Sequence, residues 1–144
     1  APATATAAAT TVDAVAASLP VGASPAELHH DPSSLVLRAT GAPDGTCTLA
    51  VASPAPLPPG LDEHRRSAVL RVTGPLTVRT RRRGERVRLA AGSRPVATLL
   101  AEAGVPRALR DRLPVVADAT DRALWVPGVA VDSTVHVGPA VARH

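Results

Sequence analysis

Arginine is the residue type whose number and spacing most clearly indicate chemistry in this chain. Residues 79–94 contain seven arginines and a single acidic residue, Glu85. Side chains alternate between the two faces of a strand, so arginines two apart share a face. Two strands that paired across Arg83-Gly84 would gather four guanidinium groups on one side of a hairpin, and such like charges repel unless an anion covers them. The pattern predicts phosphate binding by Arg79 with Arg81, and by Arg86 with Arg88.

The charge of the whole chain points in the same direction. Residues 1–64 hold one arginine against six acidic residues, whereas residues 65–144 hold fifteen against six, for a net charge of +4. This asymmetry predicts a polyanionic partner for the second half. Lysine is absent, and the favoured explanation is a coding bias toward Ala, Arg, Gly and Pro; the functional alternative is that the guanidinium group of arginine binds phosphate better than the lysine ammonium group. The alternative is a solvated edge whose arginines are partly paired with Glu102, Asp111 and Asp118.

Other reactive residue types form no convincing constellation. His29-His30-Asp31 has no partner at metal-ligand spacing, and the single Cys47 is expected to be a small core residue. Asp118, Asp121 and Asp132 are interpreted as turn formers. There is no Walker-type phosphate loop and no nucleophile elbow. We therefore expect no catalytic residue, no metal and no cofactor in this chain.

The composition predicts one modest domain. Its 144 residues include no Phe, Tyr or Met and a single Trp, so the core must be built from Leu, Val and Ala around Trp125. No apolar run approaches the roughly 18 residues of a membrane span. The Ala-rich start lacks a basic leader, so no signal peptide is predicted, and the expected location is the cytoplasm. The chain starts without Met, which is compatible with a fragment of a longer protein.

The second half shows the clearest secondary-structure signals. Ser93 is a candidate N-cap, the apolar positions Val96, Leu99, Leu100 and Ala103 form one helical stripe, and Gly104 is the expected stop. Pro106 is expected to open a shorter helix that ends at Pro114, with Leu109 and Leu113 on one side and Arg107 and Arg110 on the other. Residues 115–116 and 124–126 are predicted strands around the turn at 118–121.

The first half predicts strands at 34–40 and 46–52, joined as a hairpin, followed by strands at 67–73, 76–82 and 86–89. Short helices are expected at 11–19 and from Ser24 to Pro32, with a mobile linker as the alternative. The domain organisation expected is an Ala/Pro-rich linker or short helical segment at 1–33 and an α+β domain at 34–144. The predicted fold class is α+β: a small, mostly antiparallel sheet with two short helices, preceded by a less ordered Ala/Pro-rich N-terminal region.

The order of motifs between residues 67 and 137 resembles the C-terminal domain of tRNA(Ile)-lysidine synthetases. The resemblance lies in a basic turn with Gly84, a short helix, Val105-Pro106, then Arg110-Asp111-Arg112 before Pro114, and the strand end Leu124–Gly128. It implies contacts to the tRNA backbone, chiefly around the acceptor stem, by the basic turn, the start of the first helix and the second helix. Together with the face pattern, the predicted RNA-binding residues are Arg79, Arg81, Arg82, Arg83, Arg86, Arg88, Arg94, Arg107, Arg110 and Arg112.

The same resemblance also indicates which activity to expect of this chain. Family members carry an N-terminal Ser-Gly-Gly-x-Asp-Ser loop where ATP, with Mg, serves to attach lysine to the wobble cytidine, and no such loop occurs here. We expect the chain alone to be non-catalytic, to bind tRNA and to bind no membrane. Two further partners are left open: an N-terminal catalytic domain in the same polypeptide, and a second copy of the chain in a homodimer. Two points weaken the prediction of RNA binding. No further basic residue follows Arg94 up to Thr98, at the start of the first helix, and Arg112 could instead form an ion pair within the chain that stabilises the fold. The alternative function is a degenerate copy that acts as a protein–protein or structural module.

Overall fold

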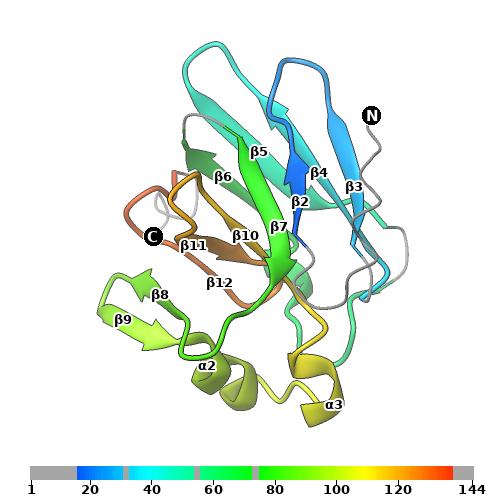
Figure 1. The fold of residues 1–144 in the computed structure, drawn as a ribbon, viewed down its shortest axis with the longest axis vertical. Coiled ribbons are helices and arrows are strands. Elements are labelled where there is room, and N and C mark those ends of the chain that lie inside the picture. Colours follow the sequence, from blue (N-terminus) through cyan, green and yellow to red (C-terminus); the bar gives the residue numbers. More distant parts are fainter. Residues whose placement is uncertain (1–15, 31–32, 54–55, 73–74, 138–144) are drawn as a thin grey trace.

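The chain folds into three layers, which a computed structural model describes for residues 16–30, 33–53, 56–72 and 75–137. A four-stranded and a five-stranded antiparallel sheet pack face to face, and a β-hairpin with two short helices covers part of the other side of the five-stranded sheet (Figure 1). Within the described ranges, no helix is long and apolar enough to cross a membrane.

The four-stranded sheet follows the chain order β3 (Ala26–His30), β4 (Leu35–Gly41), β5 (Thr46–Val51) and β6 (Ser67–Arg71). Successive residues of β4 and β5 alternate between buried and more exposed positions, as expected for strands with one face on the core. The predicted hairpin is confirmed, with Leu37 opposite Val51 and a turn closed at Gly45, whose φ is 91°. The Asp44 carboxylate accepts from the Thr46 N–H in this turn.

The five-stranded sheet has the order β12 (Ala130–Val131), β11 (Ala123–Val126), β10 (Pro114–Ala117), β7 (Leu76–Thr80) and β2 (Ala17–Leu19). All residues of β10 and β11 are buried, because these strands lie between the other two layers. The predicted strands around the 118–121 turn are confirmed, with Val116 opposite Trp125.

The third layer consists of the hairpin β8 (Arg86–Leu89) and β9 (Gly92–Pro95), followed by α2 (Val96–Glu102) and α3 (Arg107–Arg110). Gly104 adopts a φ of 84° after α2, which confirms the predicted stop. Pro106 is the N-cap of α3, as expected, although the helix ends at Arg110 and Leu113 is buried beyond it. A short 3-10 helix, η1 (Glu63–Arg65), precedes β6.

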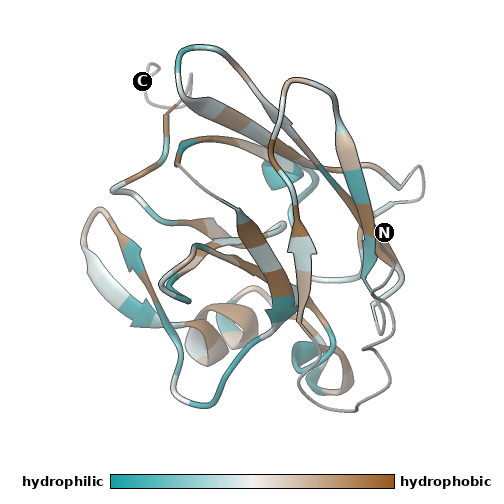
Figure 2. Cartoon of the chain, turned by 45° about the horizontal axis from the view of Figure 1, so that its top comes forward, coloured by the Kyte–Doolittle hydropathy of each residue, from teal (hydrophilic) through white to brown (hydrophobic). Residues whose placement is uncertain are grey.

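Two hydrophobic clusters fill the spaces between layers. The first joins the two large sheets and contains Trp125, which is 2% exposed, so its predicted place in the core is confirmed. Cys47 also lies here, and burial raises the pKa of its thiol, as suits a small core residue. The second cluster packs Val87, Val96 and Leu100 against the far side of β10 and β11. Figure 2 shows hydrophobic residues along β7 and α2 and a hydrophilic connection from β7 to β8.

Several sequence-based expectations are corrected by this arrangement. Ser93 is not a helix cap but lies in β9, and Pro95 takes the N-cap position. Ala103 is exposed and does not belong to the buried stripe. The segment from Ser24 is not a helix, because Ala26–His30 pairs with β4 along its whole length. Ala17–Leu19 likewise pairs with β7, whereas residues 11–15 and 31–32 lie outside the described residues.

In the described part of the chain, the fold is therefore mostly antiparallel sheet with two α-helices, in two large sheets and one hairpin instead of one small sheet. The expected pairing of residues 76–82 with 86–89 is wrong. Strand β7 pairs with β10 and β2, while β8 pairs with β9. The four arginines predicted to share one side of a hairpin are consequently separated.

Candidate nucleic-acid interface

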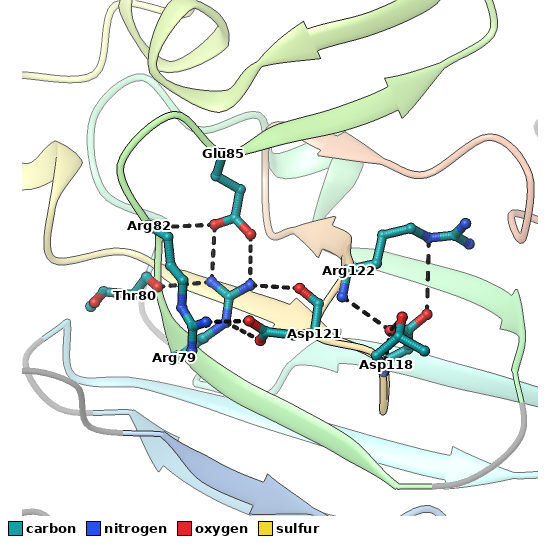
Figure 3. Close-up of polar contacts among 8 residues, drawn as sticks. Arg79, Thr80, Arg82, Glu85, Asp118, Asp121 and Arg122 are labelled. Atoms are coloured by element: carbon teal, nitrogen blue, oxygen red, sulfur yellow. Dashed lines mark hydrogen bonds and ion pairs between the residues drawn. The ribbon is translucent and has the colours of Figure 1, made fainter.

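Arg79 is the centre of a buried polar cluster at the end of β7 and is 3% exposed (Figure 3). Its Nε donates to the Asp121 Oδ1 at 2.9 Å, and its two terminal nitrogens donate to the two oxygens of Glu85 at 2.9 and 2.6 Å. The remaining N–H groups reach the carbonyl oxygens of Thr80 and Asp121 at 3.0 and 3.2 Å. All five donors of the guanidinium are therefore used within the protein.

Burial by itself lowers the pKa of the Arg79 guanidinium, but the hydrogen bonds and charges of Glu85 and Asp121 raise that pKa above its ordinary value. The cation is thus fixed in the charged state with no donor left for a ligand. Arg79 is placed to hold the fold together and not to contact a phosphate.

The basic turn between β7 and β8 is closed by Glu85, whose side chain is 8% exposed. Its backbone N–H donates to the Arg82 carbonyl at 3.0 Å, and its carboxylate accepts the Arg82 N–H at 3.0 Å. Gly84 supplies the positive φ of 75° that this reversal requires. The turn therefore has a defined shape, with Arg82 and Arg83 exposed on it.

Asp121 links the buried cluster to this exposed turn. One carboxylate oxygen accepts from Arg79, and the other pairs with the Arg82 guanidinium. Its backbone has a φ of 70°, a conformation in which Asp and Asn are enriched among non-glycine residues. Asp121 is 43% exposed, so this carboxylate stands at the boundary between core and solvent.

A second ion pair connects the basic turn to the segment after α3. The Arg81 guanidinium lies 2.8 Å from the Asp111 carboxylate, and the side chain of Arg81 is 21% exposed. Arg110 donates from Nε to the Val105 carbonyl at 2.9 Å, which holds the last residue of α3 against the loop that precedes it. The Arg81–Asp111 pair thereby brings together two arginine-rich segments across 30 positions of the sequence.

The arginines of the β8–β9 hairpin are also partly engaged. Arg86 donates from Nε to the Ser93 hydroxyl at 2.9 Å across the two strands. Arg94 forms a bidentate pair with Glu102 at 3.0 and 2.7 Å, through which β9 contacts the end of α2. The hydrogen bond from Arg94 lowers the pKa of Glu102, and Glu102 in turn raises the pKa of Arg94.

Three of the predicted arginines are exposed and make no ion pair or side-chain hydrogen bond with any described residue: Arg83, Arg88 and Arg107. Arg112 is exposed as well, and its backbone N–H donates to the Leu109 carbonyl at 2.9 Å. We define the basic layer as the exposed or half-buried arginines at positions 81, 82, 83, 86, 88, 94, 107, 110 and 112. It belongs to the turn, the hairpin and α3 with the residues after it (Figure 1).

Comparison with known proteins places this layer in a known family. The family described as "TilS substrate C-terminal domain" matches residues 76–143. The tRNA(Ile)-lysidine synthase of Geobacillus kaustophilus is 50% identical over 60 residues, which cover 40% of this chain and 13% of that protein. The corresponding enzyme of Symbiobacterium thermophilum is 48% identical over 64 residues, or 43% of this chain and 13% of that protein. A crystal structure of a TilS C-terminal domain superposes with a TM-score of 0.53 and 28% identity, over 83% of this chain and 85% of that one.

Residues 76–143 belong to the TilS C-terminal domain family.

The likeness in structure to the TilS C-terminal domain extends beyond the likeness in sequence. The family match starts at β7, whereas the structural match covers 83% of the chain and so includes much of the part before residue 76. The chain corresponds to about an eighth of the length of the curated relatives that it matches.

Sequence reasoning missed one polar cluster of this chain, formed by Arg122, Asp132 and Thr134. Arg122 donates to the Thr134 hydroxyl at 3.3 Å and lies 3.4 Å from the carboxylate of Asp132, a fully buried residue that accepts from the Thr134 N–H. The Asp118 carboxylate accepts from the N–H groups of Thr120 and Arg122 and so closes the 118–121 turn, which supports its interpretation as a turn former (Figure 3). The signal available was the pair of Asp-x-Thr sequences, each able to form a side-chain-capped turn.

The described residues contain no group of three or more His, Cys, Asp and Glu side chains that could hold a metal ion. What this chain offers is a surface of guanidinium groups, some paired with carboxylates and some without a partner among the described residues. Such groups can bind anions through charge-assisted, bidentate hydrogen bonds.

Proposed function

We propose that this chain binds tRNA through its basic layer, as the C-terminal domain of a tRNA(Ile)-lysidine synthetase. The full-length enzyme would use ATP to attach lysine to the wobble cytidine. In this proposal the chain contributes binding, chiefly to the acceptor stem and its backbone. The attachment of lysine takes place outside it.

The observation that carries the proposal is the placement of the arginines. Between residues 81 and 112 there are nine arginines and three acidic residues, and the structure assigns this stretch to one layer on one side of the five-stranded sheet. A hydrophobic cluster with Val87, Val96 and Leu100 anchors the layer, and six of its nine arginines are exposed to solvent. A partner with dense negative charge would relieve the repulsion among them.

The chemistry of the layer fits a structured RNA better than a short single strand. Double-helical RNA is recognised mostly through shape, 2′-hydroxyls and phosphates. Single-strand binders normally offer several aromatic side chains for stacking, whereas the only aromatic side chain among Phe, Tyr and Trp here is the buried Trp125. We therefore expect weak base preference and strong dependence on the phosphates.

A specific observation favours the alternative of a structural or protein-binding module. Four of the ten predicted arginines, namely Arg79, Arg81, Arg82 and Arg94, are paired with carboxylates of the same chain. In that case the ion pairs would serve the fold, and the remaining charges would be solvated.

Titration of the purified chain with tRNA at about 50 and 200 mM salt separates the two functions. Binding through several phosphate contacts releases counterions and weakens by orders of magnitude over this range. We expect such a steep loss of affinity. Binding that does not change with salt, or no binding at about 50 mM salt, would contradict the proposed function.

A further inference from the structure

The exposed carboxylate of Asp121 occupies the position beside Arg82 that a phosphate would take if the basic turn bound RNA. The two side chains are 43% and 56% exposed, and the contact joins a carboxylate oxygen to a terminal guanidinium nitrogen. Carboxylate and phosphate oxygens accept from arginine in the same way. In the free domain, the Arg82 guanidinium therefore already has an anionic partner, the Asp121 carboxylate.

The two contacts of Asp121 differ in how readily they can be exchanged. Its bond to Arg79 is buried and belongs to a guanidinium with all five donors used. Its bond to Arg82 is open to solvent, and exposed ion pairs contribute only about 0–1 kcal/mol. An incoming phosphate can therefore displace Asp121 from Arg82 while the bond to Arg79 stays in place.

The surrounding turn would not have to rearrange for this exchange. Glu85 fixes the backbone of Arg82 through two hydrogen bonds that do not involve the Arg82 side chain. The backbone is therefore held by the buried cluster, and only the Arg82 guanidinium changes its partner.

We propose that Asp121 is an internal competitor for Arg82, which holds this guanidinium in the free domain and yields it to an RNA phosphate on binding. The inference rests on the proposed function, and it makes Asp121 a residue that limits the affinity of the basic layer. Arg79 and Glu85 act as positioning residues for the same turn.

The decisive variant is Asp121→Asn, tested in the full chain with tRNA as the probe. Asparagine tolerates the positive φ at this position and keeps an amide oxygen for Arg79, but it removes the charge that competes for Arg82. We expect tRNA affinity at about 50 mM salt to rise about two- to fivefold, the value of one exposed ion pair. Unchanged or weaker binding would overturn the inference.

A double-mutant cycle distinguishes competition for Arg82 from a general effect of net charge. Arg82→Gln alone should weaken binding and reduce the salt slope by slightly less than one. On that background, Asp121→Asn should give no further gain, because the cation for which Asp121 competes is gone. A gain of equal size with and without Arg82 would contradict the inference.

Two controls complete the design. Glu27→Gln removes a carboxylate of similar exposure, 48%, from a pair on the four-stranded sheet, and should leave tRNA affinity unchanged. Asp121→Gly retains the positive φ and serves as the second variant should Asp121→Asn fail to fold. If the wild-type chain does not bind tRNA at all, the proposed function fails. If it binds and Arg82→Gln weakens it while both Asp121 variants do not strengthen it, only the inference on Asp121 fails.

Discussion

Arginines on the two sides of the five-stranded sheet are used differently. On the four-stranded sheet, Arg38 pairs with Glu27 and both side chains are nearly half exposed. On the opposite side, Arg79 and Glu85 are 3% and 8% exposed, and their cluster shapes the turn that presents further arginines. The exposed Arg38–Glu27 pair lies on the surface, whereas the buried Arg79–Glu85 pair determines the positions of neighbouring charged side chains. The difference shows that the number of ion pairs says little about a charged surface unless burial is considered.

The same two regions also differ in their likeness to known proteins. The family match begins at β7 and covers the basic layer, whereas the structural match covers 83% of the chain and so includes much of the part before β7. The five-stranded sheet lies between these two regions: Leu37 and Leu49 of the four-stranded sheet pack against one side of it with Trp125 and Val116, and Val87 and Leu100 of the basic layer's elements pack against the other. The stability of the basic layer should therefore depend on residues that have no direct part in binding.

The largest effect is expected where the two sheets meet. Trp125→Ala should lower the free energy of unfolding by roughly 3–5 kcal/mol, because no other side chain in this core has a comparable volume. Since small domains have only about 5–15 kcal/mol in total, the variant should be close to unfolded. Urea unfolding followed by circular dichroism measures the change. Intact stability together with lost tRNA binding would show instead that the indole contacts the ligand.

A smaller loss should distinguish the two kinds of ion pair. Arg79→Met leaves the Glu85 carboxylate buried without its partner and should cost about 3 kcal/mol, near the lower end for broken buried pairs. The matched control Arg38→Met breaks the exposed pair on the four-stranded sheet and should cost less than about 1 kcal/mol. Thermal unfolding of both variants provides the comparison. Equal losses would mean that the Arg79 cluster has no special role in the fold.

The smallest effect concerns acid sensitivity. Burial opposes ionisation of Asp118, but hydrogen bonds from Thr120 and Arg122 outweigh it and lower the pKa of this carboxyl below its ordinary value of 3.8. Its stabilising contribution is therefore complete above the unfolded-state pKa and is lost as the pH falls through the lower folded-state value. Asp118→Asn should lose less stability than the wild type between pH 5 and about pH 3. An identical pH dependence of urea unfolding in both proteins would contradict this assignment.

Local signals predicted the elements whose partners lie nearby. The β4–β5 hairpin followed from alternation around Gly45, and the end of α2 followed from Gly104. The strands of the 118–121 turn followed from two apolar runs, which are continuous because both faces of β10 and β11 are covered.

Non-local pairing explains what could not be predicted. The Ser24-Pro25 start signal favoured a helix, but pairing with β4 along five residues overrode it. Arg79 matched the pattern of a surface residue, and its burial depends on Asp121, which is 42 residues away in sequence. Pairing of the arginines with Asp111 and Glu102 was expected as the alternative interpretation and is confirmed, but the sequence did not indicate that the partners are Arg81 and Arg94.

The most direct test of the account is the effect of removing the three arginines that have no partner in the described parts of the chain. The triple variant Arg83→Gln, Arg88→Gln, Arg107→Gln should keep its thermal stability, since these side chains make no ion pair or side-chain hydrogen bond with the described residues. We expect its affinity for tRNA at about 50 mM salt to fall more than tenfold and the salt slope to decrease by about two to three, as befits three lost phosphate contacts. The control Arg38→Gln, Arg71→Gln, on the four-stranded sheet, should leave both quantities nearly unchanged. Equal losses in the triple variant and the control would contradict the assignment of tRNA binding to the basic layer.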